Sequence, residues 1–203
     1  MNRPQPQTAI PTSTPRAHLL RALASVVWAV VLTVTVSGGT SSGSVPVLAI
    51  AVLVSYPLID VVASLVELRA RREQARATES RLLLVNTVFS LVTAIGLGVA
   101  AGDGPGAALR VFGVWALLTG LIQVGSAVAR RRRGDRGQWP MSLSGGISSV
   151  AGLAFFQMGG QAEPALTVLA GYAVAGAVFL LVSVGLRRSP RDSEDKRVLT
   201  ANQ

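Results

Sequence analysis

The sequence predicts an all-α membrane protein in which six transmembrane helices form three repeated helical hairpins. Half of the 203 residues are hydrophobic, the mean hydropathy is +0.49, and 14% of the residues are charged, whereas a soluble domain carries about 25% charge. An aromatic residue is followed fifteen positions later by an arginine three times, at Tyr56 and Arg71, Trp115 and Arg130, and Tyr172 and Arg187. The aromatic residues lie 59 and then 57 positions apart, which indicates three copies of one unit.

Apolar stretches of span length divide the chain between two polar tails. They fit the roughly 20 residues that a helix needs to cross a bilayer. The expected spans are about 19–37, 45–68, 82–101, 107–129, 139–158 and 164–186. Residues 19–188 are therefore expected to form one transmembrane domain, and the polar residues 1–18 and 189–203 are expected to be disordered cytoplasmic tails.

Each hairpin closes at a short turn rich in glycine. The first span ends at 38–44, an uncharged Gly/Ser segment, and Pro46 then falls in the first turn of the second span, where its missing N–H costs little. The third and fourth spans meet at 102–106, and the fifth and sixth at 159–163. The first span also has the basic start of a cleaved signal peptide, but the even number of spans and the repeat favour its retention.

Cations give the orientation. Every Lys and Arg except Arg110 lies in a tail, at the start of the first or third span, or in one of the two loops between hairpins. Short loops rich in Lys and Arg stay in the cytoplasm, so both termini are expected there, in a bacterial cytoplasmic membrane crossed several times.

The same cations suggest a partner. Clusters of Arg beside a span attract anionic lipid headgroups. The alternative is that these arginines only set the orientation of the helices in the membrane, which requires the same residues. The expected contacts are Arg69, Arg71, Arg72, Arg130, Arg131, Arg132, Arg133, Arg187 and Arg188. The net charge of +9 therefore indicates contact with the lipid bilayer and not with nucleic acid. A second copy of the chain or another membrane protein is a further possible class of partner.

Polar residues inside the spans are the candidates for function, because an ionisable group in hydrocarbon costs about 2.5 to 3.5 kcal/mol. Asp60 lies seven residues before Glu67, about 10 Å from the cytoplasmic end of its helix. It is either a proton carrier, or a structural residue that pairs with a loop arginine or caps a packed polar contact. Asn86 and Gln123 either line a polar path with Asp60 or bond between helices.

Several chemistries are excluded by composition. The chain has no cysteine and a single histidine, His18, which leaves no thiol chemistry, no hydrolase triad and no zinc site. Its glycines lack the spacing of a phosphate-binding loop. We therefore expect no enzyme activity, no cofactor and no metal.

Small residues four positions apart predict close helix packing. They occur as Gly98 with Gly102 in the third span, and as Gly145 with Ser149 and Ser148 with Gly152 in the fifth. The tryptophans and tyrosines fit either interfacial belts or packing inside the bundle, and Trp139, beside a basic loop, is the best belt candidate.

The segment 115–123, Trp139 and the Gly-rich segment 145–152 resemble the HdeD-like family of small six-span bacterial membrane proteins. The resemblance covers Tyr56 to Phe156 and is weaker in the first and last spans. It implies a cytoplasmic-membrane protein associated with acid resistance, and the family offers no catalytic residues to transfer.

Two functions of different class remain open. The first is a non-enzymatic module in envelope or acid-stress tolerance, which fits the scarcity of polar groups in the spans. The second is a small transporter or proton-conducting protein with Asp60 in a polar pathway, although its repeats run parallel and not inverted as in many transporters. An enzyme acting on lipid is the residual class.

Overall fold

The computed structural model describes residues 15–37, 44–70, 77–132, 134, 139–179 and 181–182, and the ordered elements in these ranges are helices. They are α1 (Pro15–Ser37), α2 (Val47–Ala70), α3 (Ala77–Ala100), the short 3-10 helix η2 (Ala101–Asp103), α4 (Pro105–Arg132), α5 (Trp139–Met158) and a further helix, Thr167–Phe179. The all-helical class is confirmed.

Three helical segments are long and apolar enough to cross a membrane, namely Val47–Val66, Ser80–Asp103 and Pro105–Arg132. Ala22–Ser37 and Thr167–Phe179 are apolar but shorter. The helices thus support a membrane protein, and the count of six spans stays a prediction.

Helix ends differ from the expected spans by a few residues. α1 begins at Pro15, so residues 15–18, expected in the tail, are helical, because proline suits the first turn of a helix. α4 continues to Arg132, where arginines stabilise the negative end of the helix dipole. The rest of the first tail and residues 183–203 lie outside the described part of the chain.

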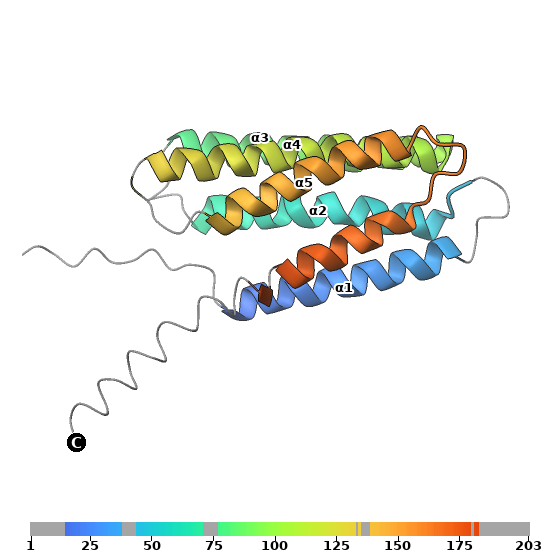
Figure 1. The fold of residues 1–203 in the computed structure, drawn as a ribbon, viewed down its shortest axis with the longest axis horizontal. Helices are drawn as coiled ribbons and strands as arrows, with labels where there is room; N and C mark the ends of the chain where they lie inside the picture. Colours follow the sequence, from blue (N-terminus) through green and yellow to red (C-terminus); the bar gives the residue numbers. More distant parts are fainter. Residues whose placement is uncertain are drawn as a thin grey trace, which may run out of the picture.

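Consecutive helices run in opposite directions along the long axis of the molecule (Figure 1). The C-terminal ends of α2 and α4 and the N-terminal ends of α1, α3 and α5 lie together at the left of the view. Arg69, Arg81 and Arg130 belong to these ends, which are called the basic end below. In sequence order, α1 packs on α2, α2 on α3, α3 on α4, and α4 on α5.

α4 and α5 are in contact through two rows of glycines, and within each row the glycines are seven residues apart. Gly106, Gly113 and Gly120 of α4 face Gly159, Gly152 and Gly145 respectively, of which Gly159 directly follows α5. A methyl group on Gly120 would lie 2.5 Å from the carbonyl oxygen of Gly145, so the backbones touch directly. We call these six residues the glycine register.

The structure confirms close packing at the small-residue pairs of the fifth span but not at the pair of the third span. Gly145 and Gly152 belong to the glycine register, and the Ser149 hydroxyl lies 3.4 Å from the Leu117 carbonyl on α4. The prediction for Gly98 and Gly102 is wrong, because no described atom would lie within 4 Å of a side chain added at either position.

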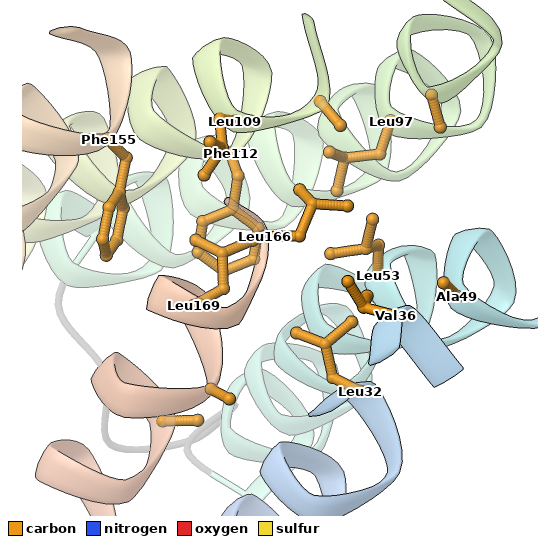
Figure 2. Close-up of a cluster of buried hydrophobic side chains, with 14 of the residues drawn as sticks. Leu32, Val36, Ala49, Leu53, Leu97, Leu109, Phe112, Phe155, Leu166 and Leu169 are labelled. Carbon is orange, nitrogen blue, oxygen red and sulfur yellow. The ribbon is translucent and has the colours of Figure 1, made fainter. Parts of the chain in front are cut away.

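A closed apolar core fills the bundle toward the end opposite the basic end. α1 and α2 contribute Leu32, Val36 and Leu53, α3 contributes Leu97, and the last helix contributes Leu169 (Figure 2). Leu32, Leu53, Leu97 and Leu169 are fully buried. Many Val, Leu and Ile side chains instead point outward from the helices, as expected of surfaces that contact lipid.

Aromatic residues from the three repeats meet at Phe112, which is fully buried. Its ring centroid lies 5.8 Å from that of Tyr56, 5.1 Å from Trp115 and 6.3 Å from Tyr172. The residues that mark the repeat in the sequence therefore pack inside the bundle. Trp139, by contrast, is 70% exposed, as a belt residue at a membrane surface would be.

The repeat is also visible in hydrogen bonding. The Trp115 indole N–H donates to Ser90 Oγ over 3.0 Å. About one repeat length later, Ser148 Oγ and Tyr172 OH share a hydrogen bond of 2.7 Å. The pair α3 and α4, and the pair α5 and Thr167–Phe179, thus hold equivalent hydrogen bonds, whereas α1 has Leu32 at the serine position, 58 residues before Ser90.

Candidate functional site

Asp60 is the centre of a hydrogen-bond network between α2 and α3. Its Oδ2 atom accepts hydrogen bonds of 2.7 Å from both Asn86 Nδ2 and Ser90 Oγ. Asn86 Nδ2 also lies 3.2 Å from Ser64 Oγ. Two of the predicted site residues, Asp60 and Asn86, are therefore direct partners.

The helices place these groups at matching depths. Asp60 lies ten residues before Ala70, the end of α2, or about 15 Å from that end. Asn86 and Ser90 are separated by one helical turn on α3, so both side chains reach the same carboxylate. An unpartnered polar group at this depth costs several kcal/mol, and the network avoids that cost for Oδ2.

The network continues into the core and ends there. Ser90 is fully buried and accepts from the Trp115 indole, whose ring packs on Tyr56 and Phe112. Beyond these rings lie the buried leucines of Figure 2. In the described residues the polar track thus reaches mid-bundle and meets an apolar barrier.

Toward the basic end, the network borders a cavity of about 200 Å³ between α2, α3, α4 and α5. Its polar lining comprises Asp60, Ser64, Asn86, Gln123, Ser126 and Arg130. Its apolar lining comprises Ala63, Leu82, Leu83, Ile122 and Met141. Gln123, the third predicted site residue, is therefore brought to the same cavity as Asp60 and Asn86, but hydrogen-bonds to neither of them.

The predicted lipid-contact arginines divide into two groups. Arg69, Arg131 and Arg132 are exposed at the basic end, as headgroup contacts must be, whereas Arg130 is half-buried and lines the cavity. The other predicted lipid contacts lie outside the described residues, namely Arg71, Arg72, Arg133, Arg187 and Arg188.

Three serines of this region were missed in the sequence, because Ser64, Ser90 and Ser126 carry ordinary hydroxyls that are common in membrane helices. Arg130 was predicted as a lipid or topology contact together with its basic neighbours, and the structure instead places it in the cavity lining. The available signal was helical periodicity, since Asp60 and Ser64 on α2, and Asn86 and Ser90 on α3, are each four residues apart and share a face.

The arrangement offers one carboxylate, one guanidinium, two amides and several hydroxyls around a small volume. Such a set binds polar molecules by hydrogen bonds and charge. The Asp60 carboxylate, with the Asn86 amide and the Ser90 hydroxyl on its Oδ2 atom, can also exchange a proton with its surroundings.

Residues 85–157 match a protein family described as a short repeat of unknown function (DUF308). The match spans most of α3, all of α4 and nearly all of α5, and holds five of the six residues of the glycine register. No curated protein and no solved structure shows a significant match to the chain. The matched segment overlaps the part of the chain, Tyr56 to Phe156, whose sequence resembles the HdeD-like family, and so supports that resemblance.

Proposed function

We propose that the protein is a non-enzymatic module of the bacterial cytoplasmic membrane that acts in envelope or acid-stress tolerance without conducting ions. The six described α-helices are its spans, paired as three hairpins, and both termini lie in the cytoplasm. The lipid bilayer and its anionic headgroups are its direct partners, and a second copy or another membrane protein is the further partner class.

The end of the polar track at an apolar barrier carries this proposal. Proton conduction requires a continuous series of polar groups or water across the membrane. Within the described part of the chain, the hydrogen-bonded track from Asp60 instead ends at Trp115, and the core residues Phe112, Leu53 and Leu97 are fully buried. The outward-facing Val, Leu and Ile side chains support stable residence in lipid.

A second candidate function, proton conduction, is favoured by one observation. Asp60, Asn86 and Ser90 form a connected set of exchangeable groups that borders a cavity. Side-chain movement at Phe112 or Trp115 would be needed to extend this set across the bundle.

Liposomes containing the purified protein and an internal pH dye separate the two candidates. Under an imposed acid gradient we expect proton entry equal to that of empty liposomes for the wild type and for Asp60→Asn. Entry above that background which disappears in Asp60→Asn would instead establish conduction. Asp103→Asn is the matched control, because Asp103 is exposed and the substitution removes a carboxylate outside the network.

The stress role requires a cellular test. A bacterial strain that lacks the protein should survive acid challenge less well than the same strain supplied with the wild type. Asp60→Asn should restore survival if conduction plays no part. Equal survival with and without the protein would refute the stress role while leaving the non-conducting structure untouched.

A further inference from the structure

The Asp60 carboxylate has one oxygen atom that the described part of the chain does not use. Its Oδ2 atom accepts from Asn86 Nδ2 and Ser90 Oγ, whereas its Oδ1 atom accepts from no residue that the structure describes. Asp60 also lines the cavity at the basic end. A carboxylate within a span that borders such a volume favours a donor with positive charge there, because hydrogen bonds to a carboxylate are strongest when the donor is charged.

Asn86 supplies a second acceptor on the same side of the network. A carboxylate only accepts hydrogen bonds, so the Asn86 amide turns its Nδ2 group toward Asp60, and Nδ2 also donates to Ser64 Oγ. The amide oxygen of Asn86 is left without a donor among the described residues. The Gln123 side chain lines the same cavity and hydrogen-bonds to no described residue. Three side-chain oxygens are therefore available as acceptors around one volume.

The size and the apolar part of the cavity limit the kind of ligand. Its larger apolar side chains are Leu82, Leu83, Ile122 and Met141. The volume of about 200 Å³ is more than one water or one bare metal ion fills, and an ion would leave these apolar side chains without contact. A short hydrocarbon chain packs against them.

We propose that this cavity binds a small primary ammonium ion that carries a short alkyl chain. The ammonium group has three N–H donors, which match Asp60 Oδ1, Asn86 Oδ1 and Gln123 Oε1. The alkyl chain lies against the apolar lining. Binding of this kind needs no path across the bundle, so it goes beyond the proposed function and does not depend on proton conduction.

Arg130 is given no contact with the charged group of the ligand. Its guanidinium has an interaction of its own, although the residue lines the cavity. It lies two residues from the end of α4, whereas Asp60 lies ten residues from the end of α2, and both helices end at the basic end. An ammonium at Asp60 is therefore the inner part of the ligand, and the uncharged alkyl chain extends toward the basic end and avoids a second cation beside Arg130.

Four ligands with the same five-carbon chain test the chemistry: pentylamine, pentanol, pentanoate and trimethylpentylammonium. Calorimetric titration of the detergent-solubilised protein, with protein-free micelles as the blank, should show pentylamine binding at least about tenfold tighter than each of the other three. Pentanol lacks the charge, pentanoate has the opposite charge, and trimethylpentylammonium has the charge but no N–H donor. Equal affinity for pentanol or for trimethylpentylammonium would overturn the proposal, as would the absence of pentylamine binding to the folded protein.

A charge substitution tests the location. Asp60→Asn should weaken binding of pentylamine by about tenfold or more. Asp103→Asn removes a carboxylate at an exposed position of the opposite end and should leave the affinity within about twofold, since it does not touch the cavity. Similar losses in both variants would overturn the assignment.

Ser126→Leu keeps the test valid if Asp60→Asn fails to fold. Ser126 lines the cavity and hydrogen-bonds to no described residue, so leucine there fills the volume and leaves the Asp60 network in place. Binding of pentylamine should disappear while the melting temperature stays close to that of the wild type. Gly125→Leu adds the same side chain one position away, where no described atom lies within 4 Å of an added methyl group, and should retain full affinity. Full binding in Ser126→Leu, or equal loss in Gly125→Leu, would refute the location.

The choice of salt distinguishes an organic ammonium from an inorganic cation as the ligand. Pentylamine should bind with equal affinity in sodium chloride and in choline chloride of the same concentration, because a sodium ion does not fill the cavity. Binding that is at least about tenfold weaker in sodium chloride alone would assign the three oxygens to the metal ion and overturn the proposal.

Discussion

Gly113 of α4 lies directly against Gly152 of α5, so that a methyl group added to Gly113 would fall 2.6 Å from the Gly152 carbonyl oxygen. The same relationship holds one heptad along in each direction, at Gly106 with Gly159 and at Gly120 with Gly145. Close backbone contact of this kind maximises van der Waals packing, which is a main source of helix association in lipid.

Alanine substitutions should distinguish glycines that are needed for close helix contact from glycines that only lower helix propensity. Gly113→Ala and Gly152→Ala should each lower the free energy of unfolding by about 2 kcal/mol, because the added methyl group forces the helices apart. Titration of the purified protein with sodium dodecyl sulfate measures this change.

Gly125 and Gly146, on the same two helices, have no described atom within 4 Å of an added methyl group. Their replacement by alanine should therefore stabilise the protein, by up to about 1 kcal/mol, through helix propensity alone. Destabilisation of all four variants by similar amounts would contradict the glycine register.

Ser90 and Ser148 occupy equivalent positions but have different numbers of partners. Ser90 joins Asp60 and Trp115, whereas Ser148 bonds Tyr172. Ser90→Ala should cost about 1 to 3 kcal/mol because it leaves a buried indole N–H unpaired. Ser148→Ala should cost about 0.6 kcal/mol, the average of hydrogen bonds within membranes.

The same unfolding titration checks this order. Ser142→Ala is the control, since Ser142 makes no hydrogen bond to a described residue. A larger loss for Ser148→Ala than for Ser90→Ala would show that the bridge at Ser90 is not a main support of the network.

Phe112→Ala should be the most destabilising of the aromatic truncations. Its side chain is fully buried and contacts four other aromatic rings, and loss of a buried phenylalanine costs about 3 to 5 kcal/mol. Phe156→Ala removes a ring that is 45% exposed on α5 and should change stability by less than about 0.5 kcal/mol. Equal effects in thermal unfolding would show that the core is not centred on Phe112.

The absence of cysteine from the sequence permits a direct test of topology. Single cysteines at Asp103 or Gln161 should react with an impermeant maleimide added to intact cells, because the basic end is expected in the cytoplasm. Cysteines at Arg69 or Arg132 should react only in inverted vesicles. All four positions are exposed, so labelling of both ends from one side would contradict the proposed spans.

The sequence predicted the helices well because apolar runs and glycine turns act locally. The marker aromatics Tyr56, Trp115 and Tyr172 also indicated the repeat, and the structure gathers them around one residue. Asp60 and Asn86 stood out because polar groups are rare in such helices, and they are bonded to each other.

The contacts that could not be predicted from the sequence depend on which face of a helix packs against a neighbouring helix. A spacing of four indicated Gly98 and Gly102, which face no other segment of the described chain. The contacts between α4 and α5 follow a spacing of seven that each segment carries in its own sequence, but the glycines that meet a neighbour are fixed only by how the two helices pack. Arg130 differs from Arg131 only by its rotation about α4, so its place in the cavity required the neighbouring helices.

The position of Phe112 has a consequence for the origin of the fold. Each copy of the repeat supplies one marker aromatic, and the rings of Tyr56, Trp115 and Tyr172 from all three copies surround one shared phenylalanine. An ancestral single hairpin would have had to assemble as a homotrimer to bury the same rings. Joining three copies in one gene removes that dependence on concentration, and it frees each copy to diverge, as the carboxylate found only at Asp60 among the equivalent positions illustrates.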